Sequence, residues 1–92
     1  MKVTKIRKMR LIRLKYGITR RELGELCGMS PQRISEIELS DAKLEESTEA
    51  KLRSAFNAVA VKRGIGLRGL QETLLRHTDT IFDTVEEAEY EL

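Results

Sequence analysis

The chain has 92 residues, of which 40% are hydrophobic, 35% are charged and 4% are aromatic. A chain of this length predicts one small domain with at most a short appended element. The single proline and the scarcity of alternating β-branched runs argue against a β-sheet protein. The basic N-terminus has no apolar core after it, so neither a secretory signal nor a membrane span is expected.

Charge is distributed unevenly along the chain. Residues 1–66 carry 15 basic and eight acidic side chains, whereas residues 67–92 carry two basic and seven acidic ones. The body therefore has a net charge of +7 and the C-terminal part a net charge of −5. A basic body favours a polyanionic partner, although a solvated helix face would give the same count.

Cys27 and His77 are the only cysteine and the only histidine. They allow neither an internal disulfide nor a metal cluster, and a lone thiol is compatible with a cytoplasmic location. They form no recognisable nucleophile–base pair, so an enzyme is not expected. We favour Cys27 as a small core residue over a redox sensor. We likewise favour His77 as a half-exposed helix residue over a pH-sensitive group at a subunit seam.

The first predicted helix covers residues 4–16. One face of it is apolar at helical spacing, which predicts burial of that face against the domain. The residues of this stripe are Ile6, Met9, Ile12 and Tyr16. Gly17 then ends the helix as a C-terminal cap.

A second short helix is predicted between Thr19 and Gly28. Thr19 and Glu22 have the spacing of a capping box, and Gly28 supplies a left-handed turn that stops the helix. Its inner face carries Leu23, Leu26 and Cys27. Gly24 costs about 1 kcal/mol inside a helix relative to alanine, so we expect another helix to approach closely there.

A third helix is predicted directly afterwards, over about residues 31–39. Ser30 is its N-cap, and Pro31 takes the first helical position, where the missing N–H costs nothing. Ile34 and Ile37 point inward at helical spacing. The outer face is left with Gln32, Arg33, Ser35 and Glu36. Two short helices joined by a tight glycine turn form a helix-turn-helix, whose second helix is presented to the major groove of DNA.

Residues 39–47 are predicted to form a loop, and a fourth helix follows over residues 48–62. Its apolar stripe consists of Leu52, Ala55, Phe56, Val59 and Ala60. Residues 64–69, "GIGLRG", spell a dinucleotide-binding fingerprint, but that fingerprint requires a preceding strand and a βαβ unit. A helix precedes it here, so we interpret the segment as a hinge and expect no cofactor.

A last, acidic helix is predicted from residue 67 to about residue 90. Apolar residues recur every seven positions along it, as in an imperfect coiled coil. They are Leu67, Leu74, Ile81 and Ala88. Close to the same seam lie Leu70, Thr78, Val85 and Leu92. This pattern predicts a dimerisation helix, or a surface for another protein.

The stretch "ITRRELGELCGMSPQRISEIE" resembles the phage repressor and Cro-like (XRE-type) family of helix-turn-helix regulators. The resemblance rests on a spaced set of caps, turn glycines and inward residues: Arg13, Thr19, Leu23, Gly24, Gly28, Ser30, Ile34 and Glu38. It implies an all-α fold, with a compact four-helix domain of the lambda-repressor-like type over residues 1–63. A hinge at 64–69 and a C-terminal amphipathic helix at 67–92 complete the expected organisation.

The resemblance also implies a functional surface. Arg13 and Glu38 should pair across two helices, and double-stranded DNA is the implied partner. The residues that match DNA-contacting positions are Arg20, Pro31, Gln32, Arg33, Ser35 and Glu36, with Lys43 as the only cation of the following loop. Gln pairs well with adenine, Arg with guanine or phosphate, and Glu with cytosine. Pro31 offers only an apolar contact, and the acidic loop around Lys43 departs from the family.

Three hypotheses follow from the sequence. The first is a homodimeric repressor that reads a palindromic operator through residues 31–39. The second is an antitoxin-like protein of the same fold that binds a toxin through its C-terminal helix. The third is a protein-interaction scaffold that has lost DNA binding, which the acidic loop after residue 39 makes worth testing.

Overall fold

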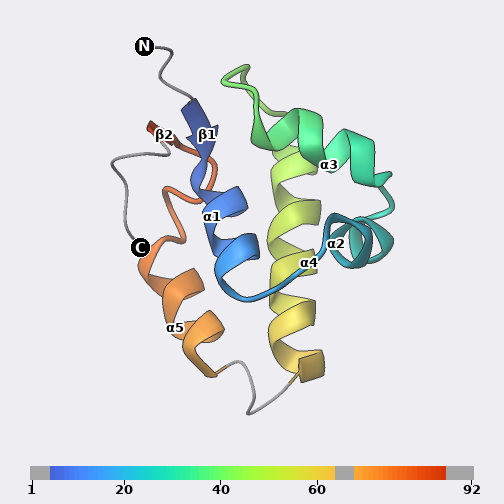
Figure 1. Cartoon of the computed structure of the whole chain (residues 1–92), viewed down its shortest axis with the longest axis vertical. Coiled ribbons are helices and arrows are strands. Elements are labelled where there is room, and N and C mark those ends of the chain that lie inside the picture. The colour runs from blue at the N-terminus through green and yellow to red at the C-terminus, as the bar shows by residue number, and fades with distance from the viewer. Residues whose placement is uncertain (1–4, 64–67, 87–92) are drawn as a thin grey trace.

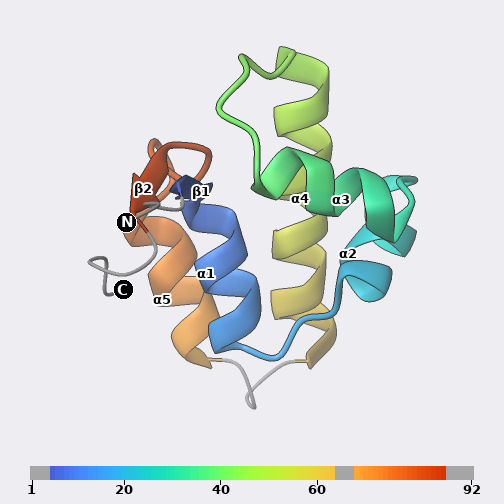
Figure 2. The ribbon, with the colours of Figure 1, turned by 45° about the horizontal axis from the view of Figure 1, so that its top comes forward.

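An 18-residue helix, α4 (Glu46–Arg63), runs through the middle of the computed structural model, which describes residues 5–63 and 68–86 (Figure 1). Helices α1 (Lys8–Lys15) and α5 (Arg68–Arg76) lie on one side of it. Helices α2 (Arg20–Cys27) and α3 (Pro31–Glu38) lie on the other side (Figure 2). Strands β1 (Lys5–Arg7) and β2 (Thr84–Glu86) form a small antiparallel sheet. The predicted all-α class is confirmed, and the sheet is a minor addition.

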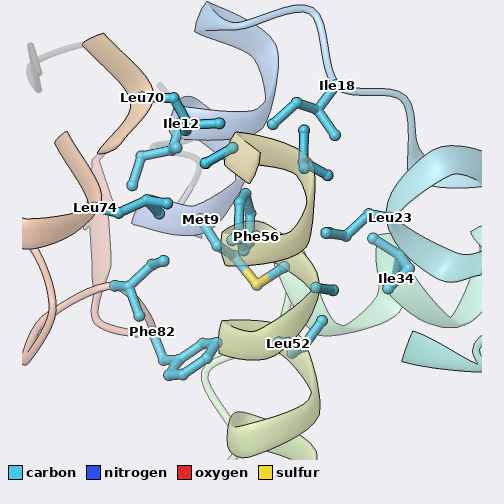
Figure 3. Close-up of a cluster of buried hydrophobic side chains, with 14 of the residues drawn as sticks. Met9, Ile12, Ile18, Leu23, Ile34, Leu52, Phe56, Leu70, Leu74 and Phe82 are labelled. Carbon is cyan, nitrogen blue, oxygen red and sulfur yellow. The ribbon is translucent and has the colours of Figure 1, made fainter. Parts of the chain in front are cut away.

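The core is built around α4. Its predicted apolar stripe is buried as expected, although the helix begins at Glu46, two residues earlier than predicted. Figure 3 shows Phe56 of α4 close to Met9 of α1, with Leu74 of α5 on one side and Leu23 and Ile34 of the α2-turn-α3 unit on the other. One apolar cluster therefore joins both sides of the molecule. None of the described helices is both long enough and apolar enough to cross a membrane.

The α2-turn-α3 unit forms as its sequence signals predict. The Thr19 hydroxyl accepts a hydrogen bond from the Glu22 amide at 3.0 Å. The Ser30 hydroxyl accepts one from the Arg33 amide at 3.1 Å. Gly28 has a φ of 72°, the left-handed conformation that ends α2. The caps and the turn glycine therefore fix both helix boundaries locally.

Two details of α2 differ from the prediction. The Glu22 carboxylate does not return to the Thr19 amide but pairs with Arg63 at the end of α4. Only half of the capping box is therefore made, and the other half becomes a contact between helices. Leu26 is 41% exposed rather than buried, because the inner face of α2 is narrower than its apolar residues suggest.

The N-terminal segment is a strand where a helix was predicted. Residues 5–7 form β1, which pairs with β2 from the other end of the chain, and α1 begins only at Lys8. Ile6 faces Val85 in this register and is still buried. Its apolar spacing was read correctly as a sign of burial. The partner strand is distant in sequence, so local periodicity could not reveal the change of element.

The predicted long C-terminal helix is wrong over residues 77–86. α5 ends at Arg76, and the chain then turns back toward α1, where the Lys8 and Met9 amides donate to Asp83 and Ile81 carbonyls at 3.0 and 2.9 Å. These carbonyls satisfy two amides that the first turn of α1 leaves free. Four apolar side chains of this segment lie in the domain's own core: Leu70, Leu74, Ile81 and Phe82.

The heptad residues Leu74 and Ile81 therefore serve the core of one chain, and the predicted continuous helix that would carry the seam does not form over residues 68–86. Gly69 lies within α5, not in a hinge. The remainder of the predicted hinge, at 64–67, lies outside the described residues. So does the end of the predicted helix, at 87–92.

Candidate nucleic-acid interface

The outer face of α3 is polar and open to solvent. Ile34 and Ile37 are buried on the inner face, together with Glu38. A helix has 3.6 residues per turn, so residues on the side of α3 opposite these three point outward. Pro31, Gln32, Arg33 and Glu36 are exposed, and Ser35 is half-buried. Five of the predicted contact residues thus share one short helix at the edge of the molecule (Figure 2).

Gly24 sets how closely α3 approaches α2. A Cβ at this position would overlap the carbonyl oxygen of Met29, in the turn just before α3. The Met29 amide in turn donates to the Gly24 carbonyl at 2.9 Å. Close approach was predicted correctly, but the prediction that another helix makes it was wrong, because the neighbour is the backbone of the turn itself. Glycine here allows the turn to fold tightly against α2.

A buried ion pair fastens the C-terminal end of α3 to α1. The Arg13 guanidinium donates from Nε to Glu38 Oε2 at 2.7 Å and from Nη2 to Oε1 at 3.1 Å. Its third group, Nη1, donates to the Ile18 carbonyl at 3.0 Å. The pair implied by the family resemblance is therefore present in bidentate form. Removing one partner of such a pair costs about 3–5 kcal/mol, because the other charge is left buried.

The two predicted contact residues outside α3 are associated with its C-terminal end, which Glu38 forms. Arg20 is the first residue of α2 and is 38% exposed, and its Nε is 3.7 Å from Glu38 Oε1. Lys43 is exposed in the loop that joins α3 to α4. Arg33, within α3, lies 3.7 Å from Glu36 in an exposed pair. Basic side chains are thus present beside α3 as well as on it.

A model of the helix-turn-helix family matches residues 9–59, which is more than half of the chain. The chain belongs to the XRE-type helix-turn-helix family. It is accordingly a DNA-binding helix-turn-helix regulator. The match covers α1, α2, α3 and most of α4, and it leaves out both strands and α5. No curated protein and no solved structure gave a match to this chain.

In this XRE-type domain, a second buried arginine anchors α3 from outside the matched segment. Arg7 of β1 donates from Nε to the Ile37 carbonyl at 2.9 Å and from Nη1 to the Phe82 carbonyl at 2.6 Å. Its Nη2 donates to the Ala42 carbonyl. Burial lowers the pKa of the Arg7 guanidinium, and Asp41 opposes that shift.

Arg7 was not predicted as a functional residue. It ties the last turn of α3 and the following loop to the C-terminal segment, 75 positions away in sequence. A cation also suits the carbonyl-rich end of a helix. No local pattern marks such a residue, because its three acceptors come from distant backbone.

Cys27 and His77 lie away from the outer face of α3. Cys27 is half-buried against the core, and burial raises the pKa of its thiol, which favours the uncharged form. His77 follows the end of α5, where burial and then the nearby charge of Lys8 lower its pKa. Across the ranges that the structure covers, no cluster of three or more acidic, His or Cys side chains could hold a metal ion.

Proposed function

We propose that this regulator is a repressor that binds a palindromic operator as a homodimer, with α3 in the major groove. One observation carries the proposal: the inner residues of α3 are buried, while its outer residues, Gln32 and Arg33 among them, are exposed. A helix held in this way can enter the groove without losing its packing on the domain. A single domain of this size buries too little surface for tight specific binding, which favours two copies.

The outer residues have chemistry suited to base edges. Gln32 can bond adenine through two groups, Arg33 can do so with guanine, and Glu36 can accept from cytosine. Arg33 and Glu36 are both exposed and 3.7 Å apart, and a surface pair of this kind adds little stability. Breaking the Arg33–Glu36 pair when DNA binds therefore costs little free energy. Pro31 and Ser35 would contact a thymine methyl and a nearby base or phosphate.

Phosphate contacts would position this helix on the duplex. Arg20 lies at the start of α2, where the helix dipole also favours an anion. Lys43 lies in the loop after α3, whose acidic neighbours, Asp41 and Glu45, reduce its contribution. We expect Arg20 to carry more of the backbone contact than Lys43 does.

The dimer would form through a groove between α4 and α5. Val61 and Leu75 flank it and are 75% and 77% exposed, the two most exposed large apolar side chains among the described residues. The groove has no charged side chain in its lining, which consists of Asn57, Ala60, Val61, Gln71, Leu74, Leu75 and Thr78. An uncharged, apolar lining suits the same surface on a second copy, because a two-fold interface pairs each patch with itself.

Variants of α3 test the proposal. Operator fragments would first be selected from random DNA with the wild-type protein. Their affinity would then be measured for wild type, Gln32→Ala, Arg33→Ala and the control Lys62→Ala. Lys62 is exposed in the last turn of α4, and that end of the helix lies away from α3 (Figure 1). Each α3 variant should lose about 1–3 kcal/mol of binding and relax the preference at one base pair. Normal operator binding by both variants would show that α3 is not the reading surface.

An antitoxin-like protein would use the same groove for a different protein. Deleting residues 67–92 cannot separate the two functions, because Leu70, Leu74 and Ile81 belong to the core. The exposed substitution Leu75→Gln is the better test. Sedimentation should show a wild-type dimer and a Leu75→Gln monomer. A wild-type chain that stays monomeric on operator DNA would exclude the homodimer and favour the antitoxin-like reading.

A further inference from the structure

Glu38 has three arginines around it, although it carries one negative charge. Arg13 makes two hydrogen bonds with its carboxylate, one to each oxygen. Arg10 and Arg20 approach one of those oxygens as well: Arg10 Nη1 lies 3.6 Å and Arg20 Nε 3.7 Å from Oε1. Both distances exceed that of a hydrogen bond. Two guanidinium groups from different helices therefore converge on one point without being bonded to it.

The convergent guanidiniums have donors and charge left over. Nε and Nη1 of Arg10 and Nε of Arg20 are enclosed without a hydrogen-bond acceptor in the described part of the chain. Arg13 already neutralises the Glu38 charge, so the cluster of three arginines and one glutamate has a surplus of two positive charges. Enclosed guanidinium donors normally find an acceptor. The surplus favours an acceptor that is negatively charged.

The outer parts of the Arg10 and Arg20 side chains reach solvent, although their atoms nearest Glu38 are enclosed. Their side chains are 20% and 38% exposed, whereas Glu38 is fully buried beneath them. Arg20 is the first residue of α2, so the positive end of that helix adds to the local potential. Glu38 is the last residue of α3, so the site borders the helix that we place in the major groove.

We propose that Arg10 and Arg20 together bind one phosphate of the DNA backbone, with Glu38 and Arg13 holding them from behind. This inference rests on the proposed function and adds a residue of α1 to the contact surface. A phosphodiester has one negative charge and two free oxygens, which match the forked donors of arginine. The contact would fix where α3 sits along the groove, since phosphate contacts set register and base contacts set sequence.

Salt titrations and single-phosphate substitutions test this phosphate contact of Arg10 and Arg20, which we call the clamp. Wild type, Arg10→Gln, Arg20→Gln and the control Lys62→Gln would be titrated on operator and on random duplex. Loss of one phosphate contact lowers the slope of log affinity against log salt by about 0.9 and the affinity roughly tenfold at about 0.1 M salt. Arg10→Gln should show both changes equally on the two duplexes, while Lys62→Gln should show neither.

Replacing operator phosphates one at a time with uncharged methylphosphonate then locates the contact. The same position should weaken wild type most and weaken both Arg10→Gln and Arg20→Gln less, because each variant has already lost one of the two arginines that bind it. Thermal unfolding would verify that each variant is folded. Arg10→Lys, which keeps the charge but lacks the fork, should lose part of the affinity and keep the coupling to that phosphate.

Three results would overturn the clamp. Arg10→Gln could keep wild-type affinity and salt slope, or it could weaken binding without coupling to any phosphate, which would make Arg10 a positioning residue for Glu38. The two arginine variants could also couple to different phosphates. A wild-type chain that binds no duplex at all would instead refute the proposed function, so the two failures are distinguishable.

Discussion

Two segments of this molecule, which we call its two halves, obtain their structure in different ways: the α2-turn-α3 unit is the DNA-binding half, and residues 68–86 are the C-terminal half. The α2-turn-α3 unit is fixed by residues a few positions apart: Thr19 caps α2, Ser30 caps α3, and Gly28 supplies the turn between them. The segment of residues 68–86 is fixed by distant partners, because β2 pairs with β1 and the Ile81 carbonyl accepts from Met9. Local sequence signals can therefore define the helix-turn-helix, while the segments that pack around it depend on contacts across the whole fold.

The two halves nevertheless share one hydrophobic core. Leu70 and Leu74 of α5 share a core cluster with Leu23 and Ile34 of the helix-turn-helix (Figure 3). Arg7 adds a polar link, because its guanidinium bonds carbonyls of both halves. Substitutions in the C-terminal segment should therefore affect the DNA-binding half as much as substitutions within it.

The largest effect is expected from the core contact of α5. Leu70→Ala should lower the free energy of unfolding by about 2–5 kcal/mol, because Leu70 is fully buried. Leu75→Ala, the same change on the same helix at an exposed position, should stay within about 0.5 kcal/mol. Urea unfolding at two protein concentrations separates folding from self-association. Equal effects of the two substitutions would show that α5 is not part of the core.

Cutting the polar link between the halves should come next. Arg7→Met keeps a long apolar side chain but leaves the Ile37, Phe82 and Ala42 carbonyls without their donor. We expect a loss of about 3 kcal/mol, since hydrogen bonds to charged groups are worth about 1.5–3 kcal/mol each and water replaces part of them. Lys5→Met, at an exposed position of the same strand, is the control. Equal free energies of unfolding in urea for Arg7→Met and Lys5→Met would mean that the Arg7 hydrogen bonds do not contribute to stability.

A smaller effect is expected inside the helix-turn-helix. Gly24→Ala improves helix propensity but forces a methyl group against the Met29 carbonyl, so the turn must shift. Overpacking of this kind costs about 1–3 kcal/mol, which should appear in thermal unfolding and in weaker operator binding. An Ala variant as stable as wild type would indicate that the turn has room that the structure does not show.

The smallest effect concerns pH and the C-terminal half. Burial and the nearby cations Lys8 and Arg76 lower the pKa of His77 in the folded chain. The unfolded chain therefore binds the proton more readily, and stability falls as the pH drops through about 6.5. Between about pH 7.5 and pH 5.5, wild type should lose slightly more thermal stability than His77→Gln. A greater loss in the variant would reverse the sign that we derive.

Sequence reasoning succeeded where a feature is encoded within one or two turns of chain. It gave the helix-turn-helix boundaries and the inward side chains of α3 directly, and the Arg13–Glu38 pair by family resemblance. It failed where a residue satisfies partners from elsewhere. The heptad spacing of Leu74 and Ile81 correctly indicated burial, but it could not show whether a second chain or the same chain buries them.

The contact surface shows the same limit. Periodicity alone separates Gln32 and Arg33 from Ile34, so the outer face of α3 was predictable. The convergence of Arg10 and Arg20 was not, because two helices must first be placed around Glu38. The role of Arg7 could not be predicted for a related reason: its acceptors are backbone carbonyls, which carry no sequence signature.

Selection of bound fragments from random-sequence DNA, at near-physiological salt, tests the central claim most directly. The account predicts an enriched inverted repeat with half-sites about one helical turn apart, bound by wild type. It also predicts that Gln32→Ala selects a repeat that is relaxed at one base pair of each half-site. Enrichment of no sequence, or of the same repeat by both proteins, would contradict the claim that the outer face of α3 reads DNA.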